Sequence, residues 1–401
     1  SDLRTENLIT YTPNESVTPV VTYGSVLTAC NTISSAAKTL ESEGYRVVAG
    51  MNGDFYNFGT GLPIGLVMTE GQIRSSDGGY YAIGFRADGT AVLGKPTIKV
   101  SADLGYAVAD ESGYTTQVVR QLAGVNKARV STGGIYLYTY DFNAKHTTGT
   151  TEAGVDVLCT IQEGTLGLGE PLVVTVDEVR ETSAATPIGE NQVVLSANAQ
   201  SNSYYVDALR RIPVGSTITF TATASSEEWN DVEYALGALY SLVENGAVVT
   251  GLPTGMDPRT AVGQKADGTL VFYTIDGRKS GHSIGASMTQ VAQRLVELGC
   301  VTALCLDGGG STTMTVTAPD STTAKTVNTP SGGSERSVSN QVFLVADSEP
   351  TDELSHFYVR PDNQYVLAGS RVHISASAVD TNFIPMDSDF ELTADEGELD
   401  G

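Results

Sequence analysis

The sequence predicts an α+β fold: a pseudo-duplicated mixed-sheet core with helices, an inserted β-rich subdomain, and a partial C-terminal immunoglobulin-like β segment. Two repeated patterns predict the duplicated core. Helix, glycine, strand and acidic turn follow one another at residues 33–57 and again at residues 287–311. A pair of hairpin patterns with Asp-Gly or Asn-Gly turns also occurs twice, at residues 65–90 and 241–269. Two hairpins can resemble each other by chance, so the duplication is a hypothesis.

The first unit begins with apolar residues at Ile33, Ala36, Ala37 and Leu40, a spacing that places them on one helix face. Gly44 can end this helix. A strand over residues 45–51 follows and runs into a turn that carries Asp54.

The second unit starts with a capping box at residues 287–290 and an apolar helix stripe from Met288 to Val296. Gly299 ends the helix, and a buried strand over residues 301–306 leads to Asp307. Asp307 opens a turn of three successive glycines, which a chain keeps where its backbone turns sharply or approaches a ligand. If the two units are related by pseudo-symmetry, Asp54 and Asp307 should face one cleft.

Between the two halves, alternating apolar and polar residues with Gly and Pro turns predict an antiparallel barrel or sandwich. Helical signal is confined there to residues 202–210. The composition changes at residues 346–350, and the short strands that follow look like about half of an immunoglobulin-like sandwich. The predicted organisation is therefore the first half of the core, the inserted subdomain, the second half of the core and the incomplete immunoglobulin-like segment, over residues 1–94, 95–230, 231–349 and 350–401.

The charge of the chain excludes several classes of partner. The 401 residues include 47 acidic and 23 basic ones, for a net charge of −24. This balance argues against nucleic acid and against an anionic membrane surface as partners. No apolar run is long enough to span a bilayer, so we expect no membrane insertion, and the sequence names no partner protein.

Composition also gives an expectation for localisation. A chain rich in Gly, Ser, Thr, Tyr and Asp with few Lys is typical of exported bacterial proteins, and its first residues resemble a trimmed start. We therefore expect a secreted or cell-surface protein whose signal peptide has been removed. Cys300 and Cys305 read as small buried apolar residues, and a Cys30–Cys159 disulfide is compatible with the sequence but not predicted.

Motif searches exclude the commonest catalytic arrangements. The chain has no Gly-x-x-x-x-Gly-Lys-Ser/Thr loop, no Gly-x-Ser-x-Gly elbow and no His-Glu-x-x-His. Only His282 of the four histidines lies near a candidate motif, which makes a Ser–His–Asp triad a weak interpretation.

What remains is a set of carboxylates and arginines on glycine-rich turns. Asp54 and Asp307 end strands, while Arg259, Arg278 and Arg336 lie in polar loops of the same half. One such arginine is more commonly a structural ion-pair residue, but three of them in so acidic a chain predict an anion site. Arginine binds phosphate oxygens in a bidentate manner, and the backbone of residues 308–311 could add an N–H nest.

Carboxylates next to a phosphate site indicate a glycosyl centre bonded to phosphate. An ordinary glycosidase protonates a poor leaving group with one acid and uses a second as base or nucleophile. A phosphodiester leaves as an anion without protonation. Its cleavage needs charge neutralisation by arginines and amides, and one carboxylate that attacks or activates water. This chemistry fits the residues better than a paired-acid glycosidase does.

Taken jointly, the motifs resemble the phosphodiester glycosidase family, which includes the lysosomal uncovering α-N-acetylglucosaminidase. The resemblance covers about residues 20–346 and rests on the segments 51–57, 258–263, 276–278, 306–311, 328–330 and 335–340. It implies hydrolysis of a sugar–phosphate diester at the anomeric carbon, with release of a sugar and a phosphomonoester. His282 lies in a segment, 279–283, that departs from the family pattern.

These observations and the resemblance give one set of candidate residues. Asp307 would attack or activate water, with Asp54 or Glu335 as its partner. The substrate, a small-molecule or cell-wall glycan phosphodiester, would be bound by Asn52, Arg259, Asp276, Arg278, Gly308, Gly309, Gly310, Ser311, Thr312, Arg336 and Asn340. No cofactor is predicted, although acidic turns are compatible with Ca²⁺. Two alternatives are a non-catalytic cell-surface protein that binds phosphoglycan or teichoic acid, and a Ca²⁺-dependent phosphoesterase.

Overall fold

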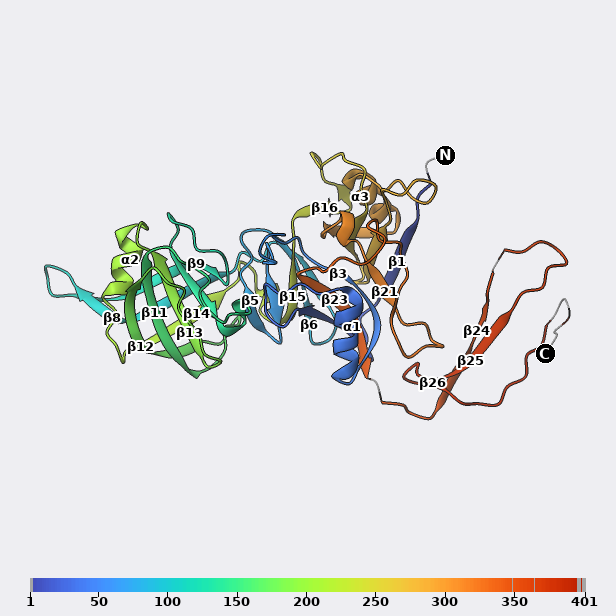
Figure 1. Cartoon of the computed structure of the whole chain (residues 1–401), viewed down its shortest axis with the longest axis horizontal. Coiled ribbons are helices and arrows are strands. Elements are labelled where there is room, and N and C mark those ends of the chain that lie inside the picture. Colours follow the sequence, from blue (N-terminus) through green and yellow to red (C-terminus); the bar gives the residue numbers. More distant parts are fainter. Residues whose placement is uncertain (1–2, 348, 364, 395–397, 399–401) are drawn as a thin grey trace.

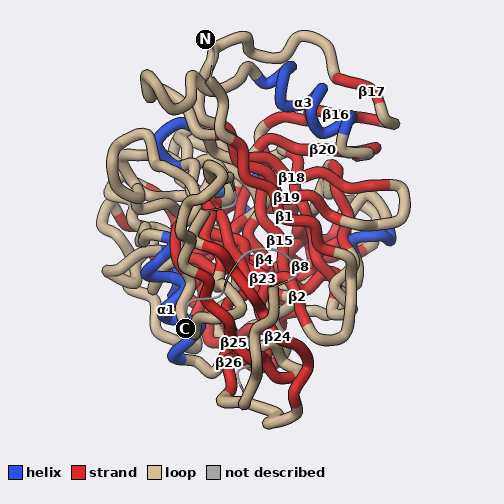
Figure 2. The backbone as a smooth tube through the Cα atoms, turned by 90° about the vertical axis from the view of Figure 1, so that its right-hand side faces the viewer, coloured by secondary structure: helices blue, strands red, loops and turns tan. Residues whose placement is uncertain are grey.

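The computed structural model describes residues 3–347, 349–363, 365–394 and 398. Strands dominate these residues, and the few helices are short (Figure 2). A β-barrel lies at one end of the molecule, a core of several sheets in the middle, and a small C-terminal sheet at the other end (Figure 1).

Three antiparallel sheets build the core. The first has the strand order β1–β19–β18–β20–β16–β17, the second β2–β23–β3–β21–β22, and the third β5–β4–β15–β6–β7. Their strands are β1 (Glu6–Tyr11), β2 (Val17–Tyr23), β3 (Tyr45–Asn52), β4 (Val67–Thr69), β5 (Gln72–Ser75), β6 (Tyr81–Arg86), β7 (Ala91–Gly94), β15 (Val232–Ala238), β16 (Tyr240–Glu244), β17 (Ala247–Val248), β18 (Arg259–Lys265), β19 (Leu270–Ile275), β20 (Cys300–Cys305), β21 (Met314–Val316), β22 (Lys325–Thr326) and β23 (Asn340–Asp347).

The inner faces of these three sheets meet in one apolar core, to which Met51, Phe85, Val262, Leu304 and Val342 contribute. The first sheet buries its other face against helix α3 (Met288–Glu297). The second sheet buries its other face against helix α1 (Ile33–Ser42). Each acid-bearing strand, β3 and β20, therefore lies between a helix and the common core.

The repeated order of helix, glycine, strand and acidic turn is confirmed in both halves. Gly44 and Gly299 end the two helices with φ of +96° and +91°, a conformation that residues with a Cβ rarely adopt. The predicted capping box is present, because Ser287 and Gln290 each accept the other's main-chain N–H at the start of α3.

The prediction of mixed sheets in the core is wrong. Every paired strand of the three core sheets is antiparallel to its neighbours. The strand over residues 300–305 is nevertheless a continuous apolar run, because a helix covers one face and the common core the other. Such a run is typical of parallel strands buried on both faces, and it does not reveal strand direction.

The inserted region is a closed barrel with the strand order β10–β13–β11–β12–β14–β8–β9. Its strands are antiparallel apart from the β9–β10 pair, which is parallel. They are β8 (Lys99–Ala109), β9 (Thr115–Val125), β10 (Ile135–Thr139), β11 (Gly154–Glu163), β12 (Leu172–Thr182), β13 (Gln192–Asn198) and β14 (Thr217–Thr223), and helix α2 (Ser203–Arg210) packs against them. The barrel lies inside the predicted range 95–230, and α2 lies where the helical signal was found.

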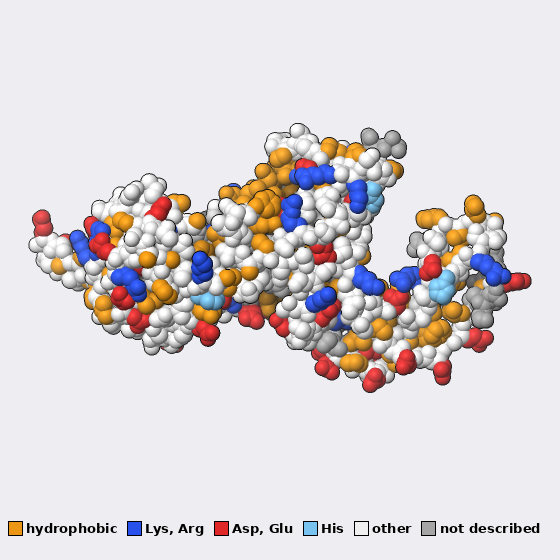
Figure 3. Space-filling view, in the orientation of Figure 1, with side chains coloured by type: hydrophobic (Ala, Val, Ile, Leu, Met, Phe, Trp, Pro, Cys, Tyr) orange, Lys and Arg blue, Asp and Glu red, His pale blue; other side chains and the backbone are white. Residues whose placement is uncertain are grey.

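The C-terminal residues form a three-stranded sheet of β24 (Leu354–Pro361), β25 (Ile374–Asp380) and β26 (Pro385–Met386). An ion pair of 3.1 Å between Arg360 and Asp320 links it to the core. No second sheet faces it in the described part of the segment, so its immunoglobulin-like character stays a prediction. Acidic side chains line the lower margin of the core and of this segment (Figure 3).

All four cysteines are free thiols, and Cys159, Cys300 and Cys305 are buried. None of the helices in the described ranges has the length and apolar character needed to cross a membrane.

Candidate active site

Asp54 and Asp307 lie on neighbouring turns. Asp307 follows the end of β20, and its main-chain N–H donates to the carbonyl of Gly53 at 3.0 Å. The side-chain amide of Asn52, at the end of β3, donates to the carbonyl of Asp307 at 2.6 Å. The two acid-bearing turns of the duplicated units are therefore joined directly by hydrogen bonds, which agrees with the pseudo-symmetry hypothesis.

Asp307 combines burial with an unbonded carboxylate oxygen. Its side chain is 8% exposed, and burial raises its pKa to about 6, against the opposing effects of Ser311 and Arg336. Its Oδ2 has no hydrogen-bond partner in the described part of the chain. Since buried polar atoms are nearly always paired, an unpaired carboxylate oxygen at a strand end is a candidate for contact with a ligand.

Asp54 is buried more deeply and is fully held in place. Its Oδ2 accepts the N–H of Gly65 at 2.6 Å, and its own N–H donates to Oδ1 of Asn340 at 2.8 Å. A Cβ at Gly65 or Gly237 would lie 2.8 or 2.5 Å from Oδ2, so only glycine at both positions leaves room for the carboxylate. Burial, together with a smaller effect of the charge of Asp307, raises the pKa of Asp54 to about 7, against the opposing effects of Gly65 and Lys127.

Lys127 was not predicted as a site residue. It lies just after β9 of the barrel, and its Nζ donates to the carbonyls of Pro63, Ile64 and Gly65 at 2.9, 2.8 and 3.0 Å. Burial lowers its pKa to about 8, although the charges of Asp54 and Asp77 oppose the change. The barrel thus supplies the cation that partly compensates the negative charge of Asp54. Nothing in the sequence around Lys127 signals this contact, because it joins residues more than sixty positions apart.

Two of the predicted arginines flank the glycine turn. A Cβ at Gly309 would lie 3.2 Å from the Arg278 guanidinium, and one at Gly310 would lie 2.2 Å from that of Arg336. Arg336 also contacts Oγ of Ser311 at 3.4 Å, while Arg278 is oriented by Asp257 at 2.8 Å. Both arginines are exposed. The turn therefore needs glycine in order to let two solvent-accessible guanidinium groups lie against its backbone.

Arg259 occupies a different environment from the other two arginines. It is 8% exposed, and its guanidinium donates to the carbonyls of Ala286 at 3.1 Å and Gly255 at 2.6 Å. It also lies 3.5 Å from Asp257, the residue that orients Arg278. Arg259 therefore orders the loop behind Arg278.

The N–H nest that the sequence suggested is largely absent. Gly309 donates its N–H to Pro258, Ser311 to Gly308, and Thr312 to Gly309, at 2.8, 3.1 and 3.3 Å. The turn closes instead as a short 3-10 helix over Gly309–Ser311, which consumes these donors. Three of its amides are therefore engaged within the protein, and the two exposed arginines are the charged groups at this turn that can bind an anion.

Asn52 and Thr312 are buried inside the turn. The Oδ1 of Asn52 accepts from Oγ1 of Thr260 at 2.9 Å and from the N–H of Thr313 at 3.1 Å. Thr312 contacts Thr260 through their hydroxyls at 3.3 Å. These residues fix the position of Asp307, and their polar atoms are engaged within the protein.

Asp276 anchors the turn from the other side. Its carboxylate accepts from the side chain of Asn328 at 3.0 Å and the N–H of Thr329 at 2.9 Å, and it contacts Nε2 of His282 at 2.8 Å. Asn328 in turn donates to the carbonyl of Thr312 at 3.1 Å. Asp276 is 1% exposed, so it joins three loops around the site.

Glu335 points toward helix α1. Its carboxylate accepts the N–H of Ser34 at 3.0 Å and the hydroxyls of Ser34 and Thr326. Burial alone would raise its pKa, but these hydrogen bonds lower it. The structure therefore brings together Asp54, Asp307, Arg278 and Arg336, and it places the Glu335 carboxylate at the N-terminus of α1.

Two aromatic residues border the site and were not predicted. The ring of Phe58 is 4.8 Å from that of Tyr56, and the Arg336 guanidinium lies 5.3 Å above it. Phe58 is 70% exposed, and the hydroxyl of Tyr56 donates to the carbonyl of Ser337 at 2.9 Å. An exposed aromatic ring in a glycine-rich loop, directly after a predicted acidic turn, is the sequence signal that could have identified Phe58.

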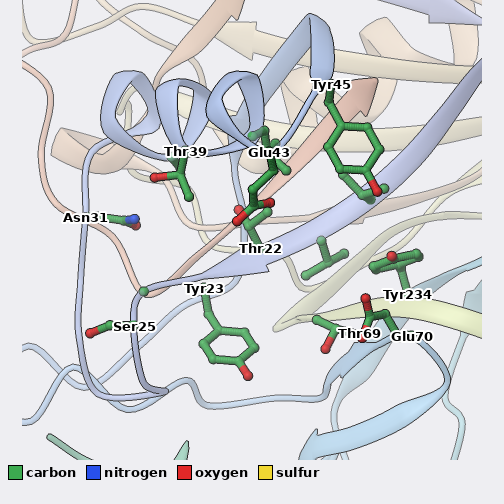
Figure 4. A pocket seen from close by; sticks show the side chains of 15 residues that line it. Thr22, Tyr23, Ser25, Asn31, Thr39, Glu43, Tyr45, Thr69, Glu70 and Tyr234 are labelled. Carbon is green, nitrogen blue, oxygen red and sulfur yellow. The ribbon is translucent and has the colours of Figure 1, made fainter. Parts of the chain in front are cut away.

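Two cavities lie near this region without containing Asp307. One of about 480 Å³ lies between α1, β2 and the β4–β5 turn, where Tyr23, Tyr45 and Tyr234 surround the carboxylates of Glu43 and Glu70 (Figure 4). Another, of about 1050 Å³, lies between the core and the barrel.

Comparison with known proteins finds a family model that matches part of the chain. Residues 170–345 match the model of the phosphodiester glycosidase family. This range contains Arg259, Arg278, Asp307 and Arg336, and it leaves Asp54 outside.

A relative and two crystal structures are also similar. The SPbeta prophage-derived uncharacterized protein YomE of Bacillus subtilis (strain 168) is 38% identical over 95 residues, which are 24% of this chain and 14% of that protein. A hypothetical protein from Synechocystis superposes with a TM-score of 0.63 and 19% identity, over 86% of this chain and 59% of that one. A Burkholderia pseudomallei K96243 protein, whose name proposes that it is exported, superposes with a TM-score of 0.59 and 17% identity, over 84% and 73%. The two structures share the fold.

The family match thus spans the half of the core that carries Asp307 and both exposed arginines, where most of the motifs that predicted it lie. The resemblance predicted from those motifs is confirmed over residues 170–345, the part of the chain that matches the model of the phosphodiester glycosidase family.

Proposed function

We propose that this protein is an exported hydrolase that cleaves glycosyl-1-phosphodiester bonds at the anomeric carbon and releases a sugar and a phosphomonoester. One observation carries the proposal. Asp307 has an unbonded carboxylate oxygen and opens a turn against which the guanidinium groups of Arg278 and Arg336 lie. A carboxylate next to two exposed cations suits a substrate in which an electrophilic carbon is bonded to a phosphate.

The reaction follows from this arrangement. Either Asp307 attacks the anomeric carbon and water then hydrolyses the resulting glycosyl ester, or a water oriented by Asp307 attacks this carbon directly. In both routes the bond between the anomeric carbon and the phosphate oxygen breaks. The phosphate oxygen keeps the electron pair and leaves as an anion, so no acid has to protonate it. Arg278 and Arg336 stabilise the charge that develops on the leaving group. The exposed ring of Phe58 offers an apolar surface for one face of the sugar.

Asp54 is a better partner for Asp307 than Glu335 is. Burial, with a smaller contribution from the charge of Asp307, raises the pKa of Asp54 to about 7, so Asp54 can accept and release a proton near neutral pH. The Glu335 carboxylate accepts hydrogen bonds from Ser34 and Thr326, which lower its pKa and make it a weak proton acceptor. We assign to Asp54 the proton that the attacking water loses.

Export is supported by the name of the similar Burkholderia protein and by the composition, which is rich in Gly, Ser, Thr, Tyr and Asp with few Lys. The substrate class is a small-molecule or cell-wall glycan phosphodiester, with no metal or other cofactor assigned to the reaction.

The test is a comparison of Asp307→Asn with wild type on UDP-N-acetylglucosamine and on N-acetylglucosamine-1-phosphate methyl diester, with products identified by mass. We expect release of free sugar by wild type and a loss of at least about 10³-fold in the variant, with an unchanged circular dichroism spectrum. The exposed Asp231 has no hydrogen bond or ion pair in the described structure, and Asp231→Asn is the matched control. Equal turnover by Asp307→Asn would remove Asp307 from the mechanism. Tight binding of these probes without release of sugar would instead support a non-catalytic phosphoglycan-binding protein.

A further inference from the structure

A cavity of about 1050 Å³ lies where the barrel meets the core. Residues 57–64 of the core form part of its wall, and residues 127–129 and 142–152 of the barrel form the rest. Its volume is at the upper end of the range for sites that bind one small molecule, about 300–1,000 Å³. A ligand longer than a single sugar can therefore be accommodated.

The charge of the lining is opposite to that of the chain. Lys127, Arg129 and Lys145 line the cavity with Glu152 as the acidic counterpart, whereas the whole chain has about twice as many acidic as basic residues. Arg129 lies 3.8 Å from Asp156, and Lys127 donates to main-chain carbonyls. Lys145 is exposed, and among the described residues it has no ion pair. The cavity therefore offers one available cation, Lys145, to an anionic ligand.

The remaining lining suits a carbohydrate. The hydroxyls of Thr28, Thr150 and Thr151 and the phenol of Tyr80 line the cavity, and no hydrogen bond occupies them in the described structure. The ring of Tyr80 is 37% exposed. Free hydroxyls next to an amphipathic aromatic ring can bind the hydroxyl groups and the apolar face of a sugar.

One loop connects this cavity with the Asp307 site. Phe58 lies against Tyr56 and Arg336, next to the glycine turn, while its neighbours Asn57, Gly59 and Thr60 line the cavity. The barrel also reaches Asp54 through Lys127, which donates to the carbonyl of Gly65. A chain held at Asp307 can thus pass over Phe58 into the cavity.

We infer that the cavity is an extended subsite that binds a phosphodiester-linked glycan chain, the continuation of the substrate whose anomeric carbon lies at Asp307. This inference rests on the proposed function for the identity of the chain, and it adds that the substrate is polymeric and that the inserted barrel selects it. Lys145 contacts a phosphate of the chain, and Tyr80 contacts a sugar ring.

The test measures binding and hydrolysis separately. Affinity for poly(N-acetylglucosamine 1-phosphate) and for neutral dextran of similar length is measured by calorimetry at about 0.1 M salt, on the background of Asp307→Asn so that no turnover intervenes. We expect Lys145→Ser to weaken binding of the phosphate polymer about tenfold and Tyr80→Ala to weaken it about fivefold, with dextran bound far more weakly throughout. Lys38 lies on α1 and Tyr114, 70% exposed, lies at the far end of the barrel, so Lys38→Ser and Tyr114→Ala are matched controls.

Each outcome decides one point. Equal losses in the control variants, or equal affinity for dextran, would overturn the subsite. Selective losses at Lys145 and Tyr80 in a protein whose wild type releases no sugar would support the subsite and contradict the hydrolase. Release of sugar by wild type, with no effect of Lys145→Ser or Tyr80→Ala on polymer binding, would support the hydrolase and overturn the subsite.

Discussion

Asn52 donates its side-chain amide to the main-chain carbonyl of Asp307 at 2.6 Å, across 255 positions of sequence. The carbonyl of the same side chain accepts from Thr260 and Thr313. Asn52 is fully buried, so one side chain holds the ends of β3 and β18 and the turn after β20 in a fixed relation. The position of the candidate nucleophile therefore depends on a residue that contacts no solvent.

Substitution of Asn52 should destabilise the fold and displace Asp307. Asn52→Ala leaves a buried carbonyl, a hydroxyl and an N–H without their partner, and we expect a loss of about 2–4 kcal/mol in the free energy of unfolding. Urea denaturation measures this loss. Turnover should fall at least as much as the smaller fraction of folded protein accounts for, because Asp307 is also displaced. Asn230 is exposed, and Asn230→Ala should change stability by less than about 0.5 kcal/mol. An Asn52→Ala protein as stable as this control would contradict the role of Asn52 in holding these segments together.

The raised pKa of Asp307 should make the protein less stable at high pH. Burial raises its pKa from an ordinary value of 3.8 to about 6, so the folded state binds this proton more tightly than the unfolded state does. The free energy of unfolding therefore falls as pH rises from about 4 to about 6, by about 3 kcal/mol at most. Asp307→Asn removes this titration. We expect the variant to be more stable than wild type at pH 8, with the difference shrinking toward pH 4, as denaturation at both pH values would show.

Lys127 should couple the barrel to Asp54. Lys127→Met leaves three carbonyls unpaired and removes the cation near Asp54, so we expect a loss of about 2–4 kcal/mol in stability and a further rise in the pKa of Asp54. Carbon-13 NMR titration of the Asp54 carboxyl measures that rise. Lys99 is exposed at the start of β8, and Lys99→Met is the matched control. An unchanged pKa of Asp54 in Lys127→Met would show that the two charges are independent.

Gly310 should be needed for the position of Arg336. In Gly310→Ala the new Cβ would lie 2.2 Å from the Arg336 guanidinium, which must then leave the turn. If Arg336 binds the phosphate, KM for a phosphodiester should rise about tenfold, while hydrolysis of a neutral aryl glycoside should change far less. Gly94 has open space around a Cβ and no positive φ, so Gly94→Ala is the matched control for replacing a glycine by alanine without a steric clash. Equal effects on charged and neutral substrates would remove Arg336 from phosphate binding.

Asp54 and Glu335 should differ in what their loss affects. Asp54→Asn should lower kcat/KM more than Glu335→Gln does, because burial raises the pKa of Asp54 to about 7 and makes it the better proton acceptor, whereas hydrogen bonds lower the pKa of Glu335. Glu335→Gln should instead cost about 1–2 kcal/mol of stability, because the carboxylate accepts donors at the N-terminus of α1. Parallel measurement of kcat/KM and melting temperature separates the two effects. A larger catalytic loss in Glu335→Gln would reverse the assignment.

Local patterns were sufficient to predict the elements of the duplicated core. Helix α1, its terminal Gly44 and strand β3 recur as α3, Gly299 and β20, because apolar spacing and a positive-φ glycine are properties of adjacent residues. Strand direction was not predictable in this way. A strand covered on both faces has the same apolar run whether its neighbours are parallel or antiparallel.

The sequence by itself determined the candidate acids, the arginine loops and the family that they resemble. Only the tertiary structure decided which of these groups meet. It placed Asp54 beside Asp307 and Arg336 against Gly310, turned the Glu335 carboxylate toward α1, and brought Lys127 from the barrel to the core. The physical reason is that burial and hydrogen bonding shift a pKa through neighbours far away in sequence, and those neighbours are defined only when the sheets pack.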